Sequence, residues 1–364
     1  MSIWKNIFGK KEKPITNYAD FWKWFEANAE QFYTIVKSGD QLEEKFFSPL
    51  SDKLKELKEG YWYVTGMCAD DCAELIITPD GIIKNIVFAE ELVAAAPRIA
   101  HWKFTALKPM LDLKDVNIEM SGSVFNSDNL CFYSNDYEEY PDEVDIVVVH
   151  PDYTEEEKDR IFNGVMIFLD NYLGELNGVT MIDAVSVCGA EQAEKELIPI
   201  SKLKDFLLWR EKEFVEKYNG IRYDTMNDQY SALEGKLQNG WPAIAVINTT
   251  LLEWDGKASH PWMLKIRIKY DGENNNGMPD RPTSDMMNAF EDEIMEQLRD
   301  VGGYLNVGRQ TLNNVRDIYI ACSDFRGASK VVYEMEARYA GKLELEWEIF
   351  KDKYWRCLEM FMGR

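Results

Sequence analysis

A histidine between two tryptophans is the part of this sequence best suited to chemistry. The chain has 364 residues and only 3 His. His260 is followed by Pro261 and Trp262, and Trp254 comes shortly before it. This pattern is typical either of an aromatic ligand pocket with a titratable group or of an apolar wedge that closes a hairpin. We take Trp254, His260 and Trp262 as candidate pocket residues and keep both interpretations open.

Two cysteines suggest a metal site at first sight. Cys68 and Cys72 have C-x3-C spacing, with Asp70 and Asp71 between them. A structural zinc site needs about four ligands, and no second Cys or His pair has usable spacing. Thioredoxin-type chemistry needs C-x-x-C, and the glycines fit neither a Walker A loop nor a dinucleotide fingerprint. The pair favours strand cysteines beside a hairpin turn, and we expect no metal and no cofactor.

Arg309 is a fourth candidate for ligand binding. It stands with Gln310 and Thr311 at the end of a predicted strand, beside the turn Asn313-Asn314. Exposed polar groups near loops often carry function, but turn formation explains them equally well. None of the three histidines lies in a nucleophile motif such as G-x-S-x-G. We therefore expect no catalytic residue.

The chain is strongly acidic. It has 41 Lys+Arg against 64 Asp+Glu, a formal net charge of -23. Such a field repels nucleic acid and anionic lipid and attracts basic proteins or cations, although an acidic surface also simply keeps a protein soluble. Our candidate surface for a basic protein partner is the densest acidic run, the alternative being a solvated loop: Asp136, Glu138, Glu139, Asp142, Glu143 and Asp145.

The apolar residues favour a globular protein in the cytoplasm. They make up 46% of the chain, but no stretch approaches the roughly 20 apolar residues that span a bilayer. Residues 1–13 lack the apolar region of a signal peptide, and we expect them to fray. The 6 Cys are scattered through strand-like segments, which favours a reducing compartment.

The periodicity predicts an α+β fold in three parts. Residues 1–59 read as a helical extension, with an aromatic stripe from Tyr18 to Val36 after the N-cap Asn17 and a second helix that starts at Pro49. Residues 60–222 read as an α+β domain whose strands include the buried run 144–149. Residues 223–364 form the last domain.

The last domain has the most legible order of elements. From Trp262 the order is β-α-β-β-α-β, the ferredoxin-like pattern, in which the first and last strands are neighbours. The first strand presents Lys265, Arg267 and Lys269 on its outer face, and the last presents Glu344, Glu346 and Glu348. Opposed rows of opposite charge are favourable, so we predict that these two strands pair. A further strand at 243–248 has no place in the plain four-stranded arrangement.

Several segments of the chain resemble a known family. Asn276-Gly277-Met278-Pro279, Val307-Gly308-Arg309-Gln310-Thr311 and Lys351-Asp352-Lys353-Tyr354-Trp355 resemble bacterial proteins catalogued as domain of unknown function 695. Phe21-Trp22-Lys23-Trp24-Phe25 resembles the companion region of such proteins in Bacteroides-like bacteria. The resemblance implies the fold and supplies no mechanism. A looser similarity links such domains to an acidic protein inhibitor of ribonuclease E, as analogy only.

The sequence therefore favours a non-enzymatic cytoplasmic protein that interacts with a partner. The charge and the missing catalytic motifs both favour this function. The alternative is a small-molecule-binding domain, or a hydrolase not recognised by motif, with a pocket near Trp254, His260 and Trp262. The oligomeric state stays open.

Overall fold

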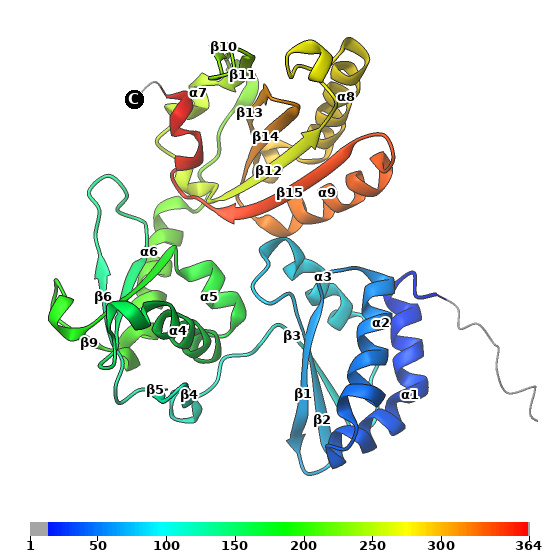
Figure 1. Cartoon of the computed structure of the whole chain (residues 1–364), viewed down its shortest axis with the longest axis vertical. Helices are drawn as coiled ribbons and strands as arrows, with labels where there is room; N and C mark the ends of the chain where they lie inside the picture. Colours follow the sequence, from blue (N-terminus) through cyan, green and yellow to red (C-terminus); the bar gives the residue numbers. More distant parts are fainter. Residues whose placement is uncertain (1–13, 363–364) are drawn as a thin grey trace, which may run out of the picture. The chain divides into compact units, whose positions relative to one another are not determined.

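The computed structural model describes residues 14–362 and divides the chain into two compact units (Figure 1). The units are Met1–Pro109 and Met110–Arg364. Both contain helices and strands, which confirms the α+β fold class. Residues 1–13, expected to fray, lie outside the described residues. In the part described, no helix is long and apolar enough to cross a membrane.

The first unit is a three-stranded sheet with helices packed on it. Its helices are α1 (Tyr18–Ser38), α2 (Ser48–Leu57) and α3 (Ile83–Ala94), and its strands are β1 (Trp62–Ala69), β2 (Cys72–Thr78) and β3 (Trp102–Ala106). The sheet order is β1-β2-β3, with β1 antiparallel and β3 parallel to β2. Cys68 and Cys72 flank the hairpin turn between β1 and β2, as expected.

Aromatic packing attaches α1 to this sheet. The Asn17 side chain caps the helix by accepting from the backbone amide of Asp20, as predicted. The ring of Phe25 lies 5.0 Å from that of Trp102, and the Trp102 indole donates to the carbonyl of Ala29 at 3.0 Å. The compact unit therefore continues to Pro109, whereas the sequence predicted a separate extension that ends at residue 59.

The second unit begins with a four-stranded sheet. Its strands are β6 (Cys131–Asn135), β7 (Asp145–Val149), β8 (Ala184–Cys188) and β9 (Ile198–Pro199), in the order β8-β7-β6-β9, preceded by the hairpin β4 (Ile118–Met120) and β5 (Ser123–Phe125). The helices are α4 (Lys158–Leu173), α5 (Glu175–Met181) and α6 (Leu203–Tyr218). Gly164 of α4 lets Phe125 approach closely, since a Cβ there would lie 2.1 Å from its ring.

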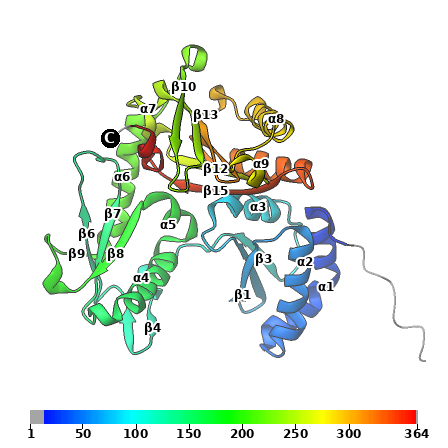
Figure 2. The same cartoon turned by 45° about the horizontal axis from the view of Figure 1, so that its top comes forward.

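A six-stranded antiparallel sheet completes the second unit. Its strands are β10 (Tyr230–Lys236), β11 (Pro242–Asn248), β12 (Trp262–Lys269), β13 (Tyr304–Leu312), β14 (Val315–Cys322) and β15 (Glu344–Lys351), in the order β10-β11-β13-β14-β12-β15. The helices are the short α7 (Thr249–Leu252), α8 (Arg281–Gln297) and α9 (Phe325–Tyr339). Helices α8 and α9 pack against each other and cover one face of the sheet (Figure 2).

The predicted charge ladder is present on the opposite face. Strands β12 and β15 pair so that Lys265 lies opposite Glu348, Arg267 opposite Glu346 and Lys269 opposite Glu344. This pairing is confirmed. Strand β11 joins the sheet at β13, and β10, which the sequence did not predict, pairs with β11. Because the sheet has six strands, the plain ferredoxin-like description stays a prediction.

Loss of Arg267 should destabilise the sheet. Its guanidinium donates two 2.8 Å hydrogen bonds to Asp317, whose carboxylate is 6% exposed. Arg267→Ala leaves that carboxylate buried with only Lys265 at 3.9 Å, so the free energy of unfolding should fall by about 1–3 kcal/mol. Urea denaturation measures the change. Lys269→Ala, whose partner glutamates are exposed, is the control and should change stability little; equal losses in both variants would contradict the account.

Candidate functional site

Trp254 and His260 lie in an apolar cluster of the second unit. Their ring centroids are 5.6 Å apart, and His260 is 1% exposed. The fully buried Trp355 packs on Trp254 and donates its indole N–H to the His260 carbonyl at 3.0 Å. These contacts support the wedge interpretation for both residues.

Ser259 contacts His260, but the direction of their hydrogen bond is not that of a catalytic pair. Ser259 Oγ lies 2.9 Å from His260 Nδ1, a pairing that could activate a nucleophile. However, the same hydroxyl donates to the carbonyl of Gly256 at 2.7 Å, so Nδ1 must supply the proton of the Ser–His bond. A histidine that donates to serine is not its base.

Trp262 and Arg309 lie at two separate cavities. Trp262 begins β12, contacts the ring of Phe325 at 4.9 Å and lines a pocket of about 490 Å³. Arg309, on β13, pairs with Glu291 at a different cavity. The three residues that the sequence suggested for one pocket and the separate candidate Arg309 are thus distributed over a core cluster and two cavities.

The pocket at Trp262 is lined by charged side chains, and we call it the Lys351 pocket. Its walls come from α5, α6, the start of β12, the N-terminus of α9 and the end of β15. The charged lining residues are Glu211, Arg222, Asp324, Arg326, Lys351 and Lys353. Four of these six are basic, although the whole chain has a net charge of -23.

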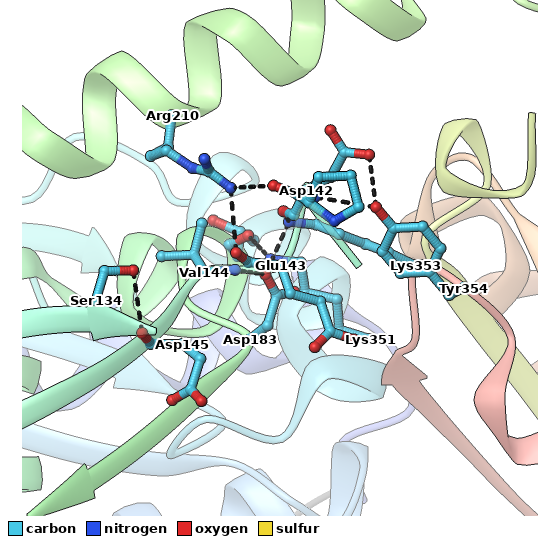
Figure 3. A network of polar contacts seen from close by, with 12 residues as sticks. Ser134, Asp142, Glu143, Val144, Asp145, Asp183, Arg210, Lys351, Lys353 and Tyr354 are labelled. Carbon is cyan, nitrogen blue, oxygen red and sulfur yellow. Dashed lines mark hydrogen bonds and ion pairs between the residues drawn. The ribbon is translucent and has the colours of Figure 1, made fainter. Parts of the chain in front are cut away.

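Two lysines share the carboxylate of Asp183, a side chain that is 12% exposed, beside this pocket (Figure 3). Lys351 Nζ lies 2.9 Å from Asp183 Oδ1, and Lys353 Nζ lies 2.8 Å from Asp183 Oδ2. Lys351 also donates to the Thr180 carbonyl at 2.5 Å, and Lys353 to the Asp142 carbonyl at 2.6 Å. We call Asp183, Lys351 and Lys353 the Asp183 triad.

The electrostatics of the Asp183 triad leave one positive charge in excess. Burial alone would raise the pKa of Asp183, but Lys351 and Lys353 lower it below its usual value. Burial lowers the pKa of Lys351 to about 8. Asp183 and, less strongly, Glu211 oppose this shift, and Lys353 adds to it. One carboxylate therefore does not fully compensate two ammonium groups.

Two carboxylates of the acidic run, Asp142 and Glu143, form hydrogen bonds and ion pairs within the second unit (Figure 3). Asp142 accepts from the hydroxyls of Tyr218 and Tyr354 at 2.6 and 2.7 Å and from Lys217 at 2.9 Å. Glu143 pairs with Arg356 at 3.2 Å. These two carboxylates are not freely presented to a partner.

The other members of the run differ in exposure. Asp145 is half-buried and accepts from Asn135 and Tyr137. Asp136 is exposed and pairs with Lys195, while Glu138 and Glu139 are exposed at the loop tip. The candidate partner surface thus narrows to Asp136, Glu138 and Glu139.

Sequence reasoning missed the residues of the Asp183 triad. Lys351 and Lys353 were noticed only as part of a family-like segment, and Asp183 lies about 170 residues away in the sequence. The available signal was two lysines that flank an aspartate at the end of the last strand. Among residues 14–362, no group of three or more His, Cys, Asp or Glu side chains could hold a metal ion.

Protonation of His260 should make the protein sensitive to acid. Burial, with a smaller contribution from Arg222, lowers the pKa of His260 from 6.5 to about 4. Between these pH values the unfolded chain binds a proton that the folded chain does not, so stability falls as the pH drops from 6.5 towards 4.

The variant His260→Gln should lack this component of the pH dependence. Relative to the variant, the wild type should lose about 3 kcal/mol of unfolding free energy between pH 7 and pH 4. Urea denaturation at several pH values measures both curves. Parallel curves for the two proteins would show that His260 titrates normally.

Comparison with known proteins gives a family resemblance for part of the chain and no function. No curated protein and no solved structure matches the chain. Residues 236–362 match a family model whose description is "Family of unknown function (DUF695)". The match contains Lys351 and Lys353 but not Asp183, and the resemblance of the N-terminal part to a companion region stays a prediction. Residues 236–362 of this chain therefore resemble the DUF695 family, as the sequence predicted.

Proposed function

We propose that the chain is a binding protein that takes a small anionic molecule into the Lys351 pocket. The Asp183 triad carries this proposal, because its excess positive charge lies at the edge of a cavity. A carboxylate or phosphate group beside Lys351 would neutralise that charge in a partly desolvated place, where such pairing is strong.

The remaining walls of the pocket suit such a ligand. Arg222 adds a cationic group at the rim, and Arg326 pairs with Asp324 at 3.3 Å. The basic side chains of the lining still outnumber Glu211 and Asp324, so an anion is attracted despite the acidic character of the whole chain. Trp262, with Leu176 and Val215 of the lining, provides an apolar side for the body of the ligand. No described contact prepares a nucleophile there, so binding rather than catalysis is the function we propose.

Anion binding should weaken as the pH rises through about 8. Lys351 attracts an anion only while it is protonated, and its pKa in the free protein is about 8. With succinate as the probe, the affinity should fall up to about tenfold per pH unit above 8, and binding at pH 8 should take up protons. Calorimetry from pH 6.5 to 9.5, in buffers of different ionisation enthalpy, measures both effects.

Matched variants separate this site from general charge effects. Lys351→Met should abolish succinate binding, and Arg222→Gln, at the exposed rim, should weaken it only a few-fold. Lys236→Met, which removes a lysine outside the pocket, should leave it unchanged. Inorganic phosphate serves as a second probe. If neither probe binds, or if Lys351→Met binds as well as the wild type, the proposal fails.

A protein-interaction role is the second proposal, and the exposed tip formed by Asp136, Glu138 and Glu139 supports it. One basic protein should be captured from lysate of the native host at low salt and released as salt rises. The combined variant Asp136→Asn, Glu138→Gln and Glu139→Gln should lose this capture, whereas Glu155→Gln should keep it. Capture by the combined variant would exclude this surface.

The proposal also includes the cellular location and the fold of the C-terminal sheet. We propose a reducing, cytoplasmic location, which the six unpaired cysteines support. We also propose that the C-terminal sheet is an extended ferredoxin-like unit. The strand order β13-β14-β12-β15 supports this assignment.

A further inference from the structure

The β1–β2 hairpin of the first unit carries a cysteine on each strand beside its turn. Ala69 pairs with Cys72 and Met67 pairs with Ala73, so a β-bulge leaves Cys68 as an extra residue opposite Cys72. The Cys68 thiol donates to the carbonyl of Cys72 at 3.3 Å. The side chain of Cys68 therefore reaches across the turn to Cys72.

The two thiols differ in exposure and in acidity. Cys68 is exposed, and Cys72 is half-buried. A hydrogen bond with the Cys68 side chain, followed by burial, raises the pKa of the Cys72 thiol. The same hydrogen bond places the two sulfur atoms side by side. Cys68 is thus the thiol that a small reagent reaches first, and Cys72 is the thiol beside it.

A cation on the neighbouring strand lies near both thiols. Lys103 of β3 pairs with Glu74 at 2.9 Å and also interacts electrostatically with Cys68 and Cys72. A positive charge near a thiol favours the thiolate, which is the form that attacks a disulfide. The surroundings of the pair therefore support thiol exchange.

The two cysteines of the four-stranded sheet lack this arrangement. Cys131 of β6 and Cys188 of β8 both pair with Val149 of β7, so they lie on either side of one strand. Two strand spacings amount to roughly 9–10 Å. A disulfide needs two Cα atoms within about 7 Å, so these two cysteines cannot join without movement of the backbone.

We propose that Cys68 and Cys72 form a reversible disulfide in the presence of a low-molecular-weight disulfide such as oxidised glutathione. The Cys68 thiolate attacks one sulfur of the reagent, and the first reduced thiol leaves. Cys72 then loses its proton and attacks the Cys68 sulfur, which releases the second reduced thiol. Two electrons and two protons pass from the two cysteines to the reagent.

This assignment agrees with the use of disulfides in reducing compartments. Disulfides there are usually transient, and many of them sense the redox state. The hairpin lies in the first unit, whereas the Lys351 pocket lies in the second, so the two proposals are independent.

Treatment of the full chain with oxidised glutathione, followed by alkylation and mass spectrometry of tryptic peptides, tests the proposal. Residues 59–84 form one tryptic peptide, in which Cys68 and Cys72 are the only cysteines. In the wild type this peptide should lose two hydrogens and take up no alkyl group. Dithiothreitol should restore two thiols that can be alkylated.

The variant Cys72→Ser separates closure of the disulfide from simple modification of Cys68. It should retain one bound glutathione, because no second thiol remains to displace it. Cys131→Ser, outside the hairpin, should form the same closed peptide as the wild type. Bound glutathione that persists on the wild-type peptide would overturn the proposal, since Cys72 would then fail to reach Cys68. Two free thiols in the wild type, or a disulfide to any other cysteine, would also overturn it.

Discussion

The sharing of one partly buried carboxylate by two lysines is the constraint on which the second unit depends. Three charged groups have left water at Asp183, Lys351 and Lys353, and each must be compensated by close contacts. Backbone groups provide them: the carbonyls of Thr180 and Asp142 accept from the lysines, and the amide of Val144 donates to Asp183 at 2.7 Å. These bonds fix three chain segments to one another and leave an excess positive charge beside a cavity.

This arrangement also joins the family-like region to the rest of the second unit. The lysines belong to residues 236–362, but their carboxylate, Asp183, precedes that region. Without Asp183, two ammonium groups would remain close together, with carbonyl oxygens and, for Lys353, the ring of Phe214 as partners. The Lys351 pocket is therefore a property of the longer chain, because α5 and α6 form one of its sides.

Local sequence patterns predicted much of the fold. The candidate site could not be predicted in this way, because it depends on contacts between residues far apart in the sequence. The cap at Asn17 and the opposed charges of β12 and β15 were predictable because they follow from spacing along the chain. The attachment of α1 to its sheet was not, since the aromatic stripe does not specify which surface it covers. Trp262 does line a pocket, but Asp183 carries no local signal of the lysines it meets.

The pKa of Lys351 is the most direct test of this account. A ¹³C NMR titration of the lysine ε-carbons, with Lys351→Arg to assign the signal, would measure it in the wild type and in Asp183→Asn. The account predicts a pKa near 8 in the wild type, and a lower value in the variant, because the attraction of the carboxylate is lost while burial and Lys353 remain. An ordinary lysine pKa of about 10.4 in the wild type would contradict it, since Lys351 would then be neither desolvated nor short of negative charge.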